Sequence, residues 1–220
     1  HFVCYGAVEG GRDYSQSQVS DNELYNMYLP AFRAAVNAGC STIMNSFSAV
    51  NGVPCAANCK LMRDVLKNDI GFDGFVVSDW GSPKWLVNHG VAENDADCAE
   101  LSIKAGIDME MATDTYRKSI KQLIANGKLT EDILNECVAR ILLIKQRFAE
   151  KRVERTDNVE LLAAAEAMSD ETMILLKNEN HTLPLAKEGK ILLTGPYATE
   201  RRSLCGSWCS GDFEKTVTLY

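Results

Sequence analysis

The sequence predicts an α/β fold built on parallel strands, either an open sheet or a (β/α)8 barrel. Phe75, Val76 and Val77 form an unbroken apolar run, which is typical of a strand with both faces buried, as in parallel sheets. Segments of strand and helix character alternate up to residue 148, as such folds require. Polarity returns abruptly at Ser78 and Asp79, so a carboxylate is expected at the carboxyl end of the buried strand, where these folds hold their functional groups.

The expected elements follow one another at a regular rhythm. Ser20 and Glu23 form a capping box, which opens a helix that runs to about residue 38. Further helices are expected over 57–68, 95–105, 115–126 and 130–148, and strands over 41–46, 75–78 and 107–111.

A change of composition after residue 148 predicts a domain boundary. Residues 149–158 are dense in charge and almost devoid of apolar side chains, so we interpret them as a linker after a first domain over 1–148. A helix from about 157 to 175 and a strand over 190–196 are then expected in a second domain over 159–220. The ends of the chain, His1-Phe2-Val3 and Thr218-Leu219-Tyr220, lead us to interpret it as a partial sequence.

Composition excludes several classes of partner. The 220 residues are 46% hydrophobic and 24% charged, as in an ordinary globular protein. A net charge of -7 and a pI near 5.1 argue against nucleic acid or an anionic membrane as partner, and no apolar run approaches the roughly 18 residues of a membrane span. The 8 cysteines are expected to be mostly free thiols. Two C-x3-C pairs, Cys55/Cys59 and Cys205/Cys209, have no third ligand nearby, so no metal site is expected.

Asp79 admits two interpretations. An Asp just after a strand often caps the next helix or forms an Asx-turn. Trp80 favours the other interpretation, because a site that grips a sugar ring needs an aromatic face against its C–H surface and a carboxylate against its polar edge.

Several motifs occur in the order in which glycoside hydrolase family 3 carries them. Ser78-Asp79-Trp80-Gly81, after Gly71-Phe72-Asp73-Gly74-Phe75, resembles the nucleophile motif of the family's β-glucosidase branch. Other matching segments are His1-Phe2, Gly10-Gly11-Arg12-Asp13-Tyr14, Met44 through Asn51-Gly52-Val53-Pro54, Ala105-Gly106-Ile107-Asp108-Met109-Glu110-Met111, Leu175-Leu176-Lys177-Asn178 with Leu183-Pro184-Leu185, Thr194-Gly195-Pro196, and Gly206-Ser207-Trp208. Each motif alone is weak, but together they cover nearly the whole chain.

The resemblance implies both a fold and an activity. The fold is the C-terminal half of a (β/α)8 barrel followed by the start of an α/β sandwich domain. The activity is that of a retaining exo-β-glucosidase, with Asp79 as nucleophile and the acid/base Glu outside this chain. His1, Arg12, Met44, Phe47 and Trp80 are implied as substrate-binding residues, and neither a metal nor an organic cofactor is implied.

The resemblance also implies details of the site. The nucleophile should sit among donors that hold its pKa down, and Arg12 and a lysine that the family carries before His-Phe are the cationic candidates. Phe47 stands where many members have Tyr, so only ring packing with a sugar is expected there. Glu93, Asp108 and Glu110 are the other nearby carboxylates, and a structural role is expected for each.

Alternatives to a β-glucosidase follow from the same residues. Trp80 suits a ring that carries a hydroxymethyl group, so glucose is favoured over xylose, with a β-xylosidase as the alternative. A catalytically inactive sugar-binding relative is a second alternative. A lyase barrel would need a Lys at a strand tip, and an N-acetylglucosaminidase would need a Pro-Gly-His-Gly loop; the sequence shows neither. The expected partner is a β-glucoside or oligosaccharide, in the periplasm or outside the cell, with the cytoplasm as alternative.

Overall fold

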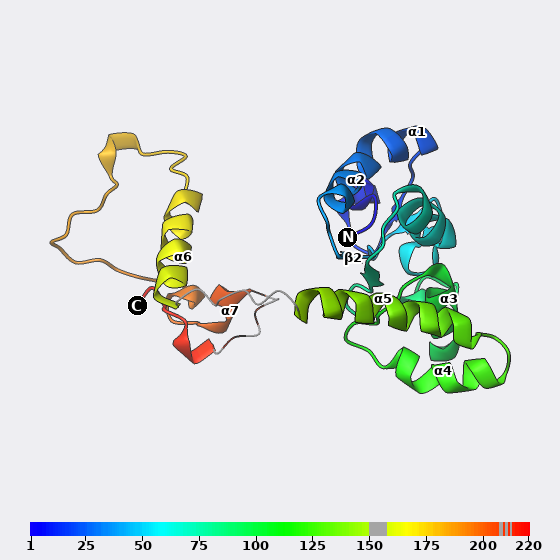
Figure 1. Ribbon diagram of the computed structural model, residues 1–220. Coiled ribbons are helices and arrows are strands. Elements are labelled where there is room, and N and C mark those ends of the chain that lie inside the picture. Colours follow the sequence, from blue (N-terminus) through cyan, green and yellow to red (C-terminus); the bar gives the residue numbers. More distant parts are fainter. Residues whose placement is uncertain (150–157, 207–208, 210, 212) are drawn as a thin grey trace. The chain divides into compact units, whose positions relative to one another are not determined.

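The chain folds into two units, His1–Glu154 and Arg155–Tyr220 (Figure 1). The computed structural model describes residues 1–149, 158–206, 209, 211 and 213–220. The expected linker over 149–158 therefore lies outside the described residues, apart from its two end positions.

Two short parallel strands form the centre of the first unit. β2 (Thr42–Met44) pairs with β5 (Phe75–Val77) over three residues, so that Ile43 faces Val76. Val76 is fully buried and Ile43 is 7% exposed, but their neighbours in the same strands are half-buried or exposed. Because alternate residues of a strand point to opposite faces, only one face of this pair is fully covered, and the expectation of two buried faces is not met. The predicted strands over 41–46 and 75–78 are confirmed in shorter form.

One further segment adds to each side of this pair. Phe2 forms a parallel bridge to Asn45, and Met109 forms a parallel bridge to Val77. The spatial order is therefore Phe2, β2, β5 and Met109, with helices in the connections. Because all four segments run in parallel, their carboxyl ends lie at one edge.

The predicted strand over 107–111 is wrong, since only the bridge at Met109 forms. The side chain of Asp108 takes the place of a ladder partner, because its Oδ2 accepts the N–H of Val76 at 2.8 Å. The N–H groups of Asp108 and Met109 both donate to the Val76 carbonyl, at 2.9 and 3.1 Å. A carboxylate thus replaces a backbone acceptor, and the ladder stops.

A second, smaller sheet stabilises the loop after β2. Its strands are β1 (Gln16–Ser17), β3 (Ala49–Val50) and β4 (Val53–Pro54), in the order β1-β3-β4. Asn51 and Gly52 join β3 to β4 with φ values of 51° and 83°, which is the two-residue turn that an Asn-Gly pair favours.

The predicted helices are present, with differences in detail. The first comprises α1 (Asp21–Glu23), a π-helical turn η3 (Leu24–Tyr28) and α2 (Leu29–Asn37). Its capping box is confirmed, because Ser20 Oγ accepts the Glu23 N–H and Glu23 accepts the Ser20 N–H. The π turn lies directly before Pro30 in α2, where a proline cannot donate to the preceding turn.

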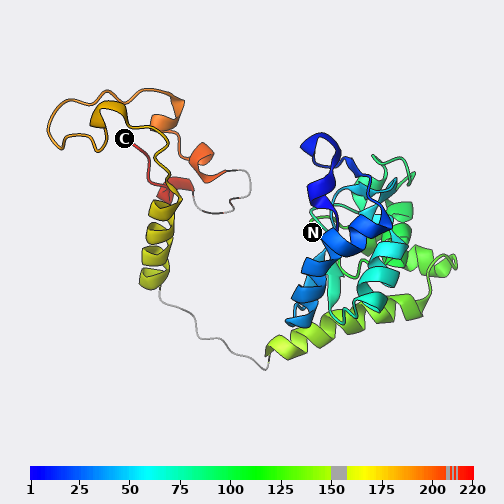
Figure 2. The same ribbon diagram turned by 90° about the horizontal axis from the view of Figure 1, so that it is seen from above.

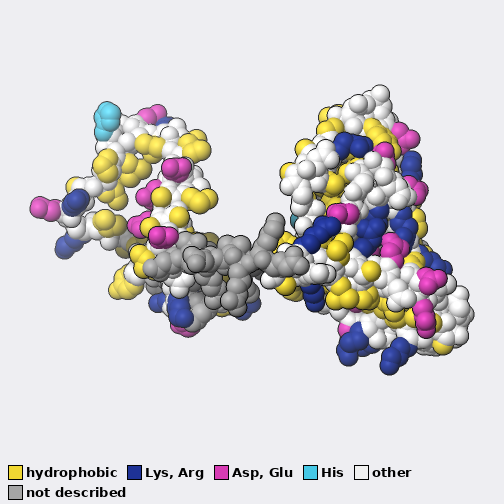
Figure 3. All heavy atoms as spheres, in the orientation of Figure 1, with side chains coloured by type: hydrophobic (Ala, Val, Ile, Leu, Met, Phe, Trp, Pro, Cys, Tyr) yellow, Lys and Arg dark blue, Asp and Glu magenta, His cyan; other side chains and the backbone are white. Residues whose placement is uncertain are grey.

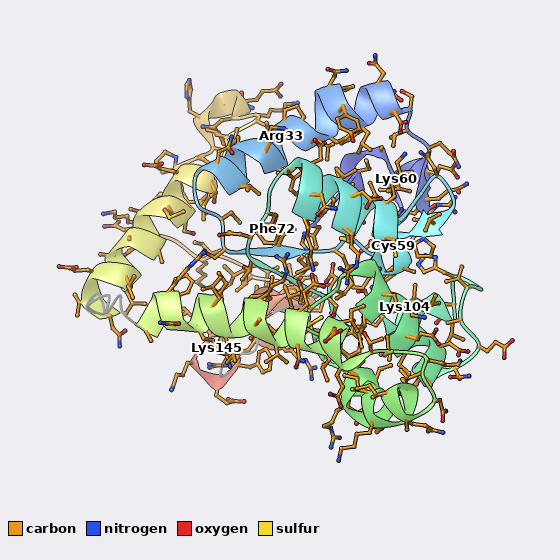
Figure 4. All side chains as sticks on the ribbon, turned by 45° about the vertical axis from the view of Figure 1, so that its right-hand side comes forward. Arg33, Cys59, Lys60, Phe72, Lys104 and Lys145 are labelled. Atoms are coloured by element: carbon orange, nitrogen blue, oxygen red, sulfur yellow. The ribbon has the colours of Figure 1, made fainter. Side chains whose placement is uncertain are left out.

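Four more helices complete the first unit. They are η5 (Lys60–Asp69), which has π-helical bonding, α3 (Asp95–Ala105), α4 (Thr115–Ala125) and α5 (Glu131–Ala149), and α4 among them packs on α3. α5 runs along one side of the first unit in both ribbon views (Figures 1 and 2). Figure 4 labels Cys59, at the start of η5, and Lys104, on α3, where the Cys59 Sγ lies 3.4 Å from the Lys104 carbonyl.

Three apolar clusters hold the first unit together, and the smallest contains Ala56, Leu86 and Cys98. The largest packs η5 and α2 against β2 and β5, with Phe72, Leu66 and Met62 each at most 1% exposed; Figure 4 labels Phe72 near the middle of the unit. The second cluster joins α3, α4 and α5. On the face drawn in Figure 3, acidic and basic side chains of this unit are intermingled.

The described part of the second unit contains helices but no strand. α6 (Asn158–Thr172) ends three residues before the predicted end, and α7 (Arg202–Cys205) is a single turn. The predicted strand over 190–196 is wrong: Ile191 and Leu192 are 72% and 87% exposed, and no described segment pairs with them. A single strand is not stable without a neighbouring strand that binds its backbone N–H and C=O groups.

Candidate active site

Asp79 lies at the carboxyl end of β5 and is only 6% exposed. Its Oδ1 accepts the N–H of Trp80 at 2.7 Å, and its Oδ2 lies 3.3 Å from Nε2 of His1. Asp79 does not cap a helix, since the next helical turn, η6 (Lys84–Leu86), begins after Pro83. The capping interpretation of Asp79 is therefore excluded, and one carboxylate oxygen faces His1.

Asn45 and Ser78 fix the backbone around Asp79. Asn45 is fully buried, and its Oδ1 accepts the Asp79 N–H at 3.2 Å and the Ser82 hydroxyl at 3.1 Å. Ser78 Oγ accepts the Met111 N–H at 2.8 Å and donates to the Asp79 carbonyl at 2.9 Å. Sequence reasoning quoted Ser78 only as part of the motif and missed Asn45, although an amide at the end of the neighbouring strand was a usable signal.

The pKa of the Asp79 carboxyl is raised above the ordinary Asp value. Burial is the largest cause, and the negative charge of Asp13 adds to it, while the hydrogen bond from the Trp80 N–H acts in the opposite direction. The expectation that surrounding donors hold this pKa down is wrong, because desolvation outweighs the donor that is present.

Arg12 does not supply the expected charge. Its side chain is exposed and folds back over Gly10, with Nε 3.2 Å from the position that a Cβ on Gly10 would occupy. Among the described residues, no ion pair joins Arg12 to Asp79. The side chain that lies near Asp79 is instead that of His1, whose ring meets that of Tyr5 edge-on at 5.4 Å.

Asp13 is a second carboxylate of this loop that sequence reasoning did not single out. Its Oδ1 accepts the hydroxyl of Tyr5 at 2.5 Å and the backbone N–H of Tyr14 at 2.9 Å. The charge of Asp13 raises the pKa of Asp79 and, after burial and the hydrogen bond itself, that of Tyr5. The loop thus places a second negative charge close enough to affect Asp79 electrostatically.

Aromatic side chains from three loops line the same edge. Phe47 is 7% exposed, and its ring lies 4.5 Å from that of Tyr14, which in turn lies 4.7 Å from Trp85. Trp80 is 56% exposed. Phe47 is therefore mostly covered by its neighbours, whereas Trp80 is open to solvent.

Met44 and a cleft also lie at the edge where the parallel strands end. Met44 is half-buried at the end of β2. A cleft of about 320 Å³ begins at Trp80, and its lining residues are Trp80, Gly81, Lys84, Trp85, Asn88, Ala112 and Thr113.

The other nearby carboxylates are engaged elsewhere. Asp108 is buried and pairs with Lys67 at 2.8 Å. Glu110 accepts N–H groups of Thr115 and Tyr116, at 3.1 and 2.9 Å, where α4 begins. Both have structural contacts, while Glu93 is exposed.

The described residues contain no group of three or more His, Cys, Asp or Glu side chains arranged to hold a metal ion. All eight cysteines are free thiols, and burial raises the pKa of Cys4 to about 12. Within the same described residues, no helix is both long and apolar enough to cross a membrane.

Comparisons with known proteins identify relatives. Residues 1–144 match the model of the glycosyl hydrolase family 3 N terminal domain. The whole chain is 35% identical to 31% of a periplasmic beta-glucosidase of Salmonella typhimurium, and 94% of it is 33% identical to 32% of a beta-xylosidase of Formosa agariphila. A beta-glucosidase of Listeria innocua, solved in complex with glucose, matches 99% of the chain over 31% of its own, with 40% identity and a TM-score of 0.78. The chain spans about a third of the length of these relatives.

Proposed function

Because the chain belongs to glycosyl hydrolase family 3, we propose that it carries the nucleophile of a retaining exo-β-glucosidase that removes terminal β-D-glucosyl residues. One observation carries the proposal. The carboxylate of Asp79 stands at the carboxyl end of a buried parallel strand, with one oxygen bound by the Trp80 N–H and the other facing His1. In this reading, the first unit is the C-terminal half of a (β/α)8 barrel, and the second begins an α/β sandwich domain.

The chemistry has two steps. In the first, an oxygen of ionised Asp79 attacks the anomeric carbon, the bond to the leaving group breaks, and an acid gives its proton to the departing oxygen. In the second, water attacks the glycosyl-enzyme, gives its proton to the same residue acting as base, and releases Asp79. We assign the acid to a Glu outside this chain, since Asp108 and Glu110 have structural partners.

His1 and the aromatic residues would hold the sugar. His1 Nε2, 3.3 Å from the carboxylate, can hydrogen-bond a hydroxyl of the same ring that Asp79 attacks. The open face of Trp80 offers packing for the C–H surface of a ring with its hydroxymethyl group. Arg12 would have to move from its place over Gly10 in order to reach a sugar. Met44 and Phe47 would contribute packing only.

Xylose is the second candidate sugar. The name of one relative supports it, because the Formosa agariphila protein, 33% identical, is a beta-xylosidase. Glucose is preferred here because of Trp80. The name of the Salmonella typhimurium relative, a periplasmic enzyme, supports a periplasmic location.

Labelling with 2-fluoro sugars tests the proposal. A 2-deoxy-2-fluoro β-glucoside with a good leaving group should inactivate the protein at its natural length and leave its glycosyl group on the peptide that contains Asp79. The corresponding xyloside should label more slowly. Asp79→Asn should abolish labelling, whereas Asp73→Asn, which removes only a surface pair with Arg147, should leave it unchanged. No label on the wild-type protein would favour an inactive sugar-binding protein, and faster labelling by the xyloside would favour a β-xylosidase.

A further inference from the structure

The ring of His1 lies next to both Asp79 and Tyr5. Its Nε2 is 3.3 Å from Asp79 Oδ2, and its centroid is 5.4 Å from that of the Tyr5 ring, with the two planes at 81°. This edge-on arrangement is a favoured geometry for two aromatic rings. The side chain of His1 is nevertheless 51% exposed, so solvent does not restrict its rotamer. Tyr5 therefore limits the directions in which Nε2 can point.

Tyr5 is anchored in turn by Asp13. It begins the helical turn η1 (Tyr5–Ala7), and its hydroxyl donates to Asp13 Oδ1 at 2.5 Å. A hydrogen bond of this length from a hydroxyl to a carboxylate is charge-assisted, and it is stronger than a bond between neutral groups. The same Oδ1 accepts the backbone N–H of Tyr14 at 2.9 Å. The loop backbone thus fixes Asp13, and Asp13 fixes the phenol ring.

The hydroxyl of Tyr5 keeps its proton in this position. Burial raises the pKa of Tyr5 most, and the hydrogen bond to Asp13 and the charges of Asp13 and Asp79 raise it further. Loss of the proton would place a third negative charge near two carboxylates. Tyr5 therefore remains a donor to Asp13 wherever these carboxylates are ionised.

We propose that Tyr5, anchored by Asp13, is a positioning residue that keeps Nε2 of His1 directed at Asp79 and at a hydroxyl of the sugar. The assignment rests on the proposed function, since that function gives His1 a sugar to bind. Tyr5 acts through His1 and takes no part in the chemical steps. The competing assignment is that the Tyr5 hydroxyl binds the sugar directly.

A double-mutant cycle distinguishes these assignments. In the protein at its natural length, Tyr5→Phe keeps the ring but removes the bond to Asp13. It should lower kcat/KM for a nitrophenyl β-glucoside by about tenfold, since small misplacements of a group that holds the substrate cost this much or more. In the His1→Ala background the same change should alter kcat/KM by less than about twofold, because its effect passes through the missing ring. Losses that multiply would overturn the proposal and favour direct binding of the sugar by Tyr5.

Substitutions of Asp13 test the anchor separately. Asp13→Asn keeps an oxygen that can accept the Tyr5 hydroxyl, so kcat/KM should stay within about twofold of the wild-type value at pH values above the acid limb. Asp13→Ala removes the acceptor and should reproduce the loss seen in Tyr5→Phe. If Asp13→Ala is as active as the wild type, or Asp13→Asn is as impaired as Asp13→Ala, the anchor has no such role.

A matched control makes the same change at another tyrosine. The hydroxyl of Tyr116 donates to the Ile107 carbonyl at 3.1 Å, so Tyr116→Phe should lower the melting temperature without lowering kcat/KM. An equal loss of kcat/KM in Tyr116→Phe and Tyr5→Phe would overturn the proposal. The dissociation constant of glucose, measured by calorimetry for the proteins of the cycle, separates this proposal from the proposed function. If the wild type binds glucose but hydrolyses no β-glucoside, the proposed function fails, whereas a loss of glucose affinity in Tyr5→Phe that vanishes in the His1→Ala background still supports the role of Tyr5.

Discussion

The buried ion pair between Lys67 and Asp108 gives a strong test of what supports the site. Lys67 Nζ lies 2.8 Å from Asp108 Oδ1, and the two side chains are 3% and 0% exposed. The other oxygen of Asp108 accepts the N–H of Val76 in β5. Burial lowers the pKa of Lys67, while the charge of Asp108 acts in the opposite direction. The pair thus connects η5 to the strand that leads to Asp79.

Lys67→Met should destabilise the first unit strongly. At 2.8 Å the attraction is about 6 kcal/mol for an effective dielectric constant of about 20, and desolvation of each ion offsets several kcal/mol of it. Loss of the cation leaves the Asp108 carboxylate buried and unpaired, because Arg63 and Arg140 already bind Glu136 at 3.1 and 3.4 Å. Removing one partner of such a pair costs about 3–5 kcal/mol.

Hydrogen exchange measured by mass spectrometry can follow this change in a multidomain protein. Peptides that contain β5 should exchange faster by about two to four orders of magnitude, since each tenfold corresponds to about 1.4 kcal/mol. The double variant Lys67→Met/Asp108→Asn should recover most of the protection, because Asn keeps an acceptor for the Val76 N–H without a charge. A loss below about 1 kcal/mol in the single variant, or a double variant as unstable as the single one, would refute the reasoning.

Three further substitutions test the site and its frame. Asp13→Asn should move the acid limb of the kcat/KM profile to lower pH, because the negative charge of Asp13 raises the pKa of Asp79. Gly74→Ala should lower the melting temperature and cost about 1–3 kcal/mol or more, because its Cβ would lie 2.1 Å from the Ser41 carbonyl oxygen. Asn45→Ala should lower kcat by about 10- to 100-fold with little change in KM, because the Asp79 N–H loses its partner.

Each of these variants has a matched control. Asp21→Asn removes a surface carboxylate that pairs with Lys60 and should leave the pH profile in place. Gly6→Ala meets no atom within 4 Å and should not lower the melting temperature. Asn58→Ala removes a buried amide that binds the Leu61 N–H, so it should cost stability without lowering kcat. A variant that behaves like its control would contradict the reason given for it. Besides Asp13, the side chains that interact with Asp79 and could affect the pH profile of Asp13→Asn are His1, Tyr5 and Tyr14.

The elements that local sequence determines were predictable. The capping box of Ser20 and Glu23 and the apolar run Phe75 to Val77 each specify their own structure, and the structure contains both. The two wrong strands depend on partners. Residues 107–111 have a neighbour in β5, but the Asp108 side chain takes the N–H that a ladder would use. Residues 190–196 have no described partner at all.

Only the site residue that directly follows a strand could be placed from the sequence. Asp79 follows β5 directly, so its place at the edge followed from the sequence pattern. Its pKa did not follow, because desolvation depends on how the loops close over the carboxylate. The family resemblance implied Arg12 as a cation beside Asp79, yet its side chain lies over Gly10. Side-chain direction in a loop is a tertiary property that the residue types alone do not determine.

The edge that carries Asp79 is held more by side chains than by the strand ladder. β2 and β5 pair over only three residues, and Phe2 and Met109 add single bridges. Buried N–H groups still need partners, and here Asn45, Ser78 and Asp108 provide them, to Asp79, Met111 and Val76 respectively. None of these three side chains is assigned a chemical step. Since each fixes the backbone on which the nucleophile is carried, substitutions that remove them should reduce turnover even where the fold survives.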